Sequence, residues 1–114
     1  MSLQDLLAGL QKTYLASMPE KIARIETLFS AKSFDELESE YHKLKGTGRT
    51  YGIPEVTQLG AAMERLCDTH AEHLGQMVPV SVQLIKAITE SRIAGNAFDL
   101  DSNADFKKII DLIE

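Results

Sequence analysis

Apolar side chains recur every three or four residues along most of the chain, which is the spacing of one buried face on an α-helix. This pattern predicts six helical segments, over about residues 2–16, 18–31, 34–51, 54–69, 78–94 and 103–113. No segment alternates apolar and polar residues as a half-buried β-strand does. We therefore expect an all-α fold, an antiparallel four-helix bundle with an extra N-terminal helix and a short C-terminal helix.

The segments between these ranges contain the signals that start and end helices. Ser17 and Ser33 each precede a glutamate by three residues, which is the arrangement of a capping box. Gly52 suits the end of the third helix, and Pro54 suits the first turn of the fourth. Residues 70–75 are predicted to form a polar connection.

Length and composition restrict the class of protein. A chain of 114 residues is long enough for one hydrophobic core, so we expect one domain over residues 1–114 with its core at about 15–95. The net charge of -5 argues against nucleic-acid binding, which needs a basic face. The single cysteine, Cys67, fits a reducing cytoplasm, and no apolar run reaches the ~20 residues of a membrane span. We expect a cytoplasmic monomer.

Two glycines, Gly46 and Gly48, lie inside the third predicted helix, where each costs roughly 1 kcal/mol relative to alanine. The apolar seam of this helix comprises Phe34, Leu37, Tyr41, Leu44, Gly48 and Tyr51. At about 100° per residue, His42 lies roughly 130° from the middle of that seam and should face solvent or a partner. Gly46 and Arg49 fall on the same outer side, and Lys45 lies at its edge. Gly46 would leave bare backbone beside the imidazole, whereas Gly48 would admit a neighbouring helix.

An exposed histidine beside a glycine and basic residues can act as a nucleophile. Neutral imidazole is a good nucleophile near pH 7, because its unperturbed pKa is about 6.5. Lys45, together with Lys43 or Arg49, could offset the charge of a phosphoryl group or attract an acidic partner. No Gly-rich phosphate loop is present in the sequence. The domain therefore supplies a nucleophile, and its partner must supply the remaining machinery.

Two possible metal sites are weak. His70 and His73 could share a metal, but two ligands alone make a poor site. The acidic residues in 99–105 resemble the start of a calcium loop, but the sixth position is Ala104 instead of glycine. Capping of the last helix by Ser102 explains these polar residues better. We predict no metal site and no resident cofactor.

The run His42-Lys43-Leu44-Lys45-Gly46-Thr47-Gly48 resembles the signature of histidine-containing phosphotransfer (Hpt) domains. In that signature, a histidine is followed by a leucine, a lysine, a glycine, a serine or threonine and a small residue. Gly52 and then Leu59, Ala62 and Glu64 continue the resemblance, which extends over about residues 15–95.

The resemblance implies that Nε2 of His42 carries a phosphoryl group. This group would be exchanged with the aspartate of response-regulator receiver domains, and a hybrid histidine kinase would be a further partner. Lys45 matches the lysine near the phosphate, and Gly46 matches the glycine that gives the receiver access. A polar residue of the next helix often lies near the histidine, and Gln58 and Glu64 are the candidates. Magnesium is expected on the receiver.

Lys43, Arg49 and Gln58 are the residues we expect to contact the docked partner. The chain is expected to be a phosphoryl carrier without kinase activity of its own. The main alternative is a helical adaptor that binds a receiver or kinase without carrying phosphate. A phosphohistidine phosphatase is a third possibility, and it would need an acid or base placed against His42.

Overall fold

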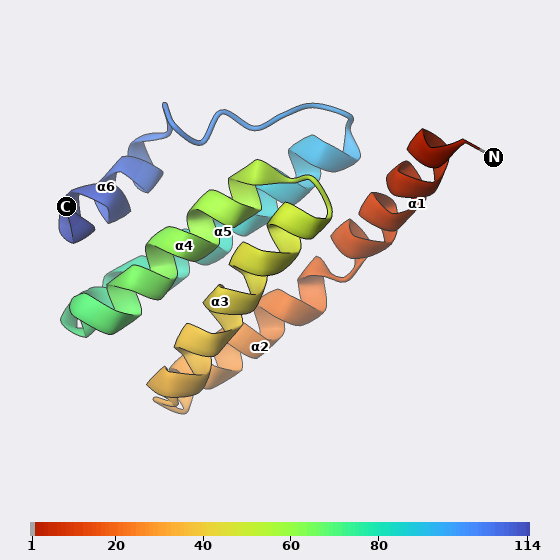
Figure 1. Ribbon diagram of the computed structural model, residues 1–114. Coiled ribbons are helices and arrows are strands. Elements are labelled where there is room, and N and C mark those ends of the chain that lie inside the picture. The colour runs from red at the N-terminus through yellow and green to blue at the C-terminus, as the bar shows by residue number, and fades with distance from the viewer. Residues whose placement is uncertain (1) are drawn as a thin grey trace.

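A computed structural model describes residues 2–114, which form six α-helices; short turns join the first five, and a longer loop over 94–103 leads to the last (Figure 1). The helices are α1 (Leu3–Ala16), α2 (Met18–Ser30), α3 (Phe34–Thr50), α4 (Pro54–Thr69), α5 (Leu74–Ile93) and α6 (Ala104–Ile113), with a 3-10 turn at Ala71–His73. No strand occurs within the described residues. The all-α helical bundle predicted from the periodicity is confirmed.

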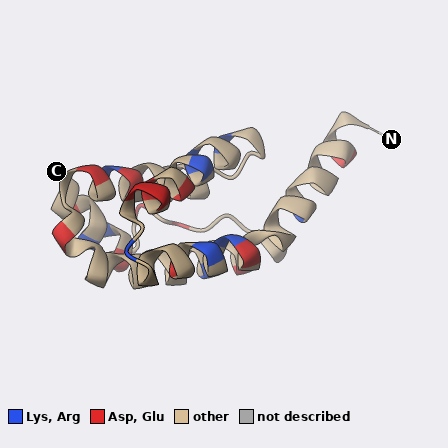
Figure 2. Cartoon of the chain, turned by 90° about the horizontal axis from the view of Figure 1, so that it is seen from below, with Lys and Arg blue, Asp and Glu red and all other residues tan. Residues whose placement is uncertain are grey.

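Helices α2, α3, α4 and α5 form the bundle, because each packs against the next and α5 packs back against α2. The chain reverses direction at each short turn between them (Figure 1). Helix α6 lies on α4 and α5, whereas α1 extends beyond the end of the bundle (Figures 1 and 2). None of the helices in residues 2–114 combines the length and the apolar character that crossing a bilayer requires.

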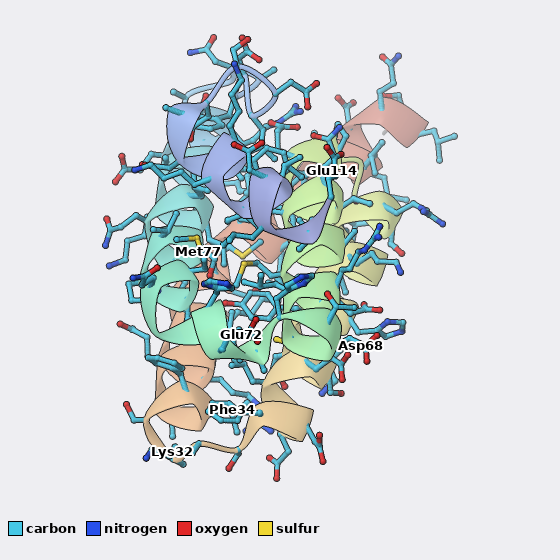
Figure 3. All side chains as sticks on the ribbon, turned by 90° about the vertical axis from the view of Figure 1, so that its left-hand side faces the viewer. Lys32, Phe34, Asp68, Glu72, Met77 and Glu114 are labelled. Carbon is cyan, nitrogen blue, oxygen red and sulfur yellow. The ribbon has the colours of Figure 1, made fainter. Side chains whose placement is uncertain are left out.

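The predicted seam of α3 is largely buried in the core. Leu37 and Tyr41 are fully buried, and the Tyr41 hydroxyl makes a hydrogen bond of 2.5 Å with Ser81 Oγ on α5. Phe34, at the start of the seam, remains 39% exposed at the end of the bundle (Figure 3). A single cluster of buried side chains includes residues of all six helices, so α6 belongs to the same core.

Three predicted helix caps are wrong. Ser17 has a helical backbone, and its hydroxyl donates to the Tyr14 carbonyl, because α1 passes directly into α2 with a single residue between them. Ser33 precedes α3 but makes no capping hydrogen bond. Asn103, one residue after the predicted Ser102, caps α6, because its side-chain oxygen accepts from the backbone N–H groups of Asp105 and Phe106. A serine hydroxyl caps a helix only when its own backbone is extended and aims it at those N–H groups.

Helix α5 begins four residues earlier than predicted, at Leu74. Its first turn buries Leu74 and Met77, and Met77 points into the bundle (Figure 3). The polar connection expected over 70–75 is therefore shorter, and most of it is the 3-10 turn. Gly75 and Gln76 favoured a loop in this stretch, but Leu74 and Met77 are three residues apart and bury their side chains in the core, so the helix begins earlier.

A buried ion pair ties the segment before α6 to the bundle. The Glu55 side chain on α4 is only 6% exposed, and both of its oxygens accept from the Arg92 guanidinium at 2.5 and 2.7 Å. The backbone N–H of Phe98 donates to the same carboxylate. Burial raises the pKa of Glu55, but these hydrogen bonds outweigh it and lower the pKa.

Candidate functional site

His42 lies on the outer face of α3, and its side chain is 67% exposed. Its Nδ1 is 2.8 Å from Oε2 of Glu64 on α4. An ionised carboxylate can only accept a hydrogen bond, so Nδ1 carries the hydrogen and Nε2 of the neutral ring keeps its lone pair. The ring is thus oriented by one nitrogen and exposes the other as a nucleophile.

Glu64 also interacts with the lysine of the motif. Lys45 Nζ lies 3.7 Å from Glu64 Oε1, while the other carboxylate oxygen contacts His42. The Glu64 side chain is 25% exposed, and that of Lys45 is 37% exposed. A mobile ammonium group one turn from the imidazole can move from Glu64 to an anion on Nε2, since lysine is a flexible point charge.

The two glycines of α3 have opposite surroundings. A Cβ added to Gly46 would meet nothing within 4 Å, so the backbone beside His42 is open. A Cβ added to Gly48 would lie 2.6 Å from the backbone nitrogen of Thr57 and 2.7 Å from its hydroxyl. Gly48 therefore allows the close approach of α3 and α4.

A third glycine, Gly60 on α4, was missed in the sequence interpretation. A Cβ there would lie 2.6 Å from the backbone nitrogen of Lys45 and 2.9 Å from the carbonyl oxygen of Tyr41. Tyr41 directly precedes His42, and Lys45 lies one turn after it. Glu64 is one turn after Gly60. The absent side chain thus brings Glu64 within reach of the imidazole. Like Gly48, Gly60 lies among the buried apolar residues of its helix, and that position is the signal in the sequence.

Negative charge gathers on one side of the histidine. Loss of hydration, and then the carboxylates of Asp68 and Glu64, raise the pKa of Glu38, which lies one turn before His42. Asp68 points outward from α4 (Figure 3). The basic side chains Lys45 and Arg49 lie toward the other end of α3. A partner therefore meets a face that is acidic at one end and basic at the other.

The expected docking residues lie on different sides of the bundle. Lys43 Nζ is 3.3 Å from Glu40 Oε1, which also accepts from Arg24 Nε at 2.7 Å, so Lys43 borders a groove between α2 and α3. Burial raises the pKa of Glu40, but these two cations outweigh it and lower the pKa.

Arg49 and Gln58 line a shallow pocket at the turn between α3 and α4. Gln58 also borders the groove between α4 and α6. Of the two candidates for a polar partner of His42, the structure brings Glu64 to the imidazole and not Gln58.

The other candidate residues are His70, His73 and Cys67. His70 and His73 have ring centroids 6.4 Å apart, and His70 Nδ1 makes a hydrogen bond with Thr69 Oγ1. No three His, Cys, Asp or Glu side chains of residues 2–114 are grouped so that they could hold a metal ion. Burial, and then the nearby charge of Glu38, raise the pKa of Cys67 to about 12, so this thiol is unreactive near neutral pH.

Comparison with known proteins identifies one family. The sequence model described as the Hpt domain matches residues 9–94, which is well over half of the chain and includes His42, Glu64, Gly46, Gly48 and Gly60. No curated protein and no solved structure matches the sequence significantly.

Proposed function

The chain belongs to the Hpt domain family, whose members act as histidine phosphotransfer carriers in phosphorelays, and we propose that Nε2 of His42 carries the phosphoryl group. The observation that carries this proposal is the exposed ring whose Nδ1 is bound to Glu64 at 2.8 Å. Neither His70 nor His73 has such a carboxylate partner at Nδ1 among the described residues. We expect the relay to work in the cytoplasm.

The proposed reaction is a transfer between an aspartyl phosphate of a receiver domain and the imidazole. The Nε2 lone pair attacks phosphorus, the N–P bond forms, and the P–O bond to the receiver's aspartate breaks to release its carboxylate. Nδ1 keeps its hydrogen throughout, and Glu64 stabilises the positive charge that develops on the ring. The reverse reaction passes the group to a second receiver. Magnesium would be bound by the receiver.

The residues around His42 have distinct proposed roles. Lys45 offsets the charge of the phosphoryl group after leaving Glu64, and Gly46 leaves room for the incoming receiver loop. Arg49 and Gln58, in the pocket at the turn between α3 and α4, would contact the docked receiver on one side. Lys43, in the groove between α2 and α3, would contact it on the other side. A receiver and a hybrid histidine kinase are the proposed partners. A chain with only these groups is not expected to phosphorylate itself from ATP.

Incubation with a radiolabelled phosphorylated receiver tests the proposal. We expect acid-labile label on the wild-type chain and none on His42→Gln, because the variant lacks the proposed nucleophile. His73→Gln is the matched control, since it removes a histidine that is not near Glu64, and it should be labelled as the wild type is. Label that persists in His42→Gln contradicts the proposal. Binding of the receiver without any label on the wild type indicates the adaptor instead.

A further inference from the structure

The N-terminal half of α1 carries an apolar face that the bundle does not cover. Leu3 is 82% exposed, Leu6 50%, Leu7 44% and Leu10 46%. Their spacing of three, one and three residues places all four on one stripe of the helix. A contiguous exposed stripe of this kind is typical of a surface that is covered by another molecule.

The stripe carries no charge. Residues 3–16 of α1 contain only two charged side chains, Asp5 and Lys12 (Figure 2). At about 100° per residue, both lie roughly 150–170° from the middle of the stripe, on the far side of the helix. Covering the leucines therefore desolvates no charge. A helix with a single cation is also poorly suited to an anionic membrane surface, which attracts basic helices.

The order of the leucines is the same when the helix is read backwards. Positions 3, 6, 7 and 10 are symmetric about a point between residues 6 and 7. An isologous pair of identical chains requires such a self-complementary surface. We propose that a second copy of this chain covers the stripe, with the two α1 helices antiparallel about a two-fold axis. Leu3 then faces Leu10 of the second copy, and Leu6 faces Leu7.

The shape of the chain allows this pairing. Helix α1 becomes attached to the bundle from Gln11 onward, where Gln11 Nε2 donates to the Tyr51 carbonyl at 2.7 Å, and Tyr14 stacks on Tyr51. Antiparallel overlap of residues 2–11 extends over about 15 Å and leaves the two bundles at opposite ends. Helix α1 carries one charge of each sign, so the net charge of -5 of each chain lies mainly on the distant bundles.

Such an interface is small compared with the ~800 Å² per partner of a standard complex, so the dimer should be weak and dependent on concentration. This proposal departs from the monomer expected from the sequence. It is independent of the function of His42, because none of the four leucines belongs to that site.

Sedimentation equilibrium of the full chain, in reducing buffer that prevents Cys67 disulfides, tests the proposal. Over about 10 µM to 1 mM, a range suited to a small interface, the wild type should shift from monomer toward dimer. Leu6→Glu and Leu7→Lys should each remain monomeric. Ala8→Glu, on the same exposed helix but outside the stripe, should dimerise as the wild type does.

Mixing the two variants decides the arrangement. Because residue 6 faces residue 7 of the second copy, Leu6→Glu and Leu7→Lys should form a mixed dimer with an ion pair, while each variant alone does not. Helical content by circular dichroism, equal in all variants, checks that the chains are folded. A wild type that stays monomeric at about 1 mM overturns the proposal, and so does a mixture that stays monomeric while the wild type dimerises.

Discussion

Gly46 and Gly48 are two residues apart on α3, and they lie on opposite faces of it. Gly46 faces open space beside His42, where no atom would meet an added Cβ. Gly48 faces α4, where an added Cβ would lie 2.6 Å from backbone. The exposed glycine weakens the helix, and we propose that it is there because a partner must approach the histidine. The buried glycine is required by the packing itself.

This contrast separates the effect of a mutation on the free energy of unfolding from its effect on phosphoryl transfer. On the buried side, a substitution should lower the free energy of unfolding. On the exposed side, it should change phosphoryl transfer and leave the fold intact. Gly60 connects the two, because it belongs to the packed interface but also places Glu64 against the imidazole.

The largest effect is expected for Gly60→Ala. The added methyl group meets backbone atoms of α3 on two residues, so one helix must move, and overpacking of this kind costs about 3 kcal/mol. The same movement should lengthen the contact between Glu64 and His42 and slow transfer. Urea denaturation and a transfer assay on the folded protein measure the two effects. Unchanged stability would show that the close packing of α3 on α4 is not required.

A somewhat smaller loss, about 2 kcal/mol, is expected for Gly48→Ala, because one of its close contacts is a threonine hydroxyl that can rotate away. The midpoint of urea denaturation should fall. Transfer by the folded fraction should stay close to that of the wild type, since Gly48 faces away from His42. A variant that keeps its stability but loses transfer would place Gly48 in the functional site.

Glu64→Gln tests the exposed side. The amide oxygen can still accept from Nδ1, but the negative charge that stabilises the charged ring is lost, so we expect transfer to slow about tenfold, or 1.4 kcal/mol. Stability should change by less than about 1 kcal/mol, because the pair is partly exposed. Glu90→Gln, which removes the same charge from an exposed position on α5, is the control.

The smallest change in stability is expected at Gly46. Gly46→Ala should raise the free energy of unfolding by up to about 1 kcal/mol, because alanine favours the helix and meets no neighbour. Gly46→Leu should keep the fold yet slow transfer, since its side chain would cover the approach to His42. Thermal unfolding measures the stability of both variants, and the transfer assay measures their rates of phosphoryl transfer. Leucine at position 46 without any effect on transfer would contradict the role of this glycine in access.

Much of the fold could be predicted because it depends on one helix at a time. The 3.6-residue period placed His42 outside and Gly48 inside without reference to any neighbour. The same logic failed for Ser17 and Ser33, whose patterns are those of helix caps but whose backbones are set by the chain around them. Periodicity also did not predict whether the leucines of α1 are buried or exposed, because an apolar stripe does not indicate whether the fold will cover it.

The order of the residues was enough to predict that the chain is helical, that one histidine faces solvent and that one motif glycine faces the core. It did not show that Glu64, and not Gln58, reaches the imidazole, or that Gly60 permits this contact; the packed helices show both. Periodicity defines an angle on a single helix, whereas a contact across two helices depends on their relative rotation, offset and separation. Those quantities are set by packing of the whole core.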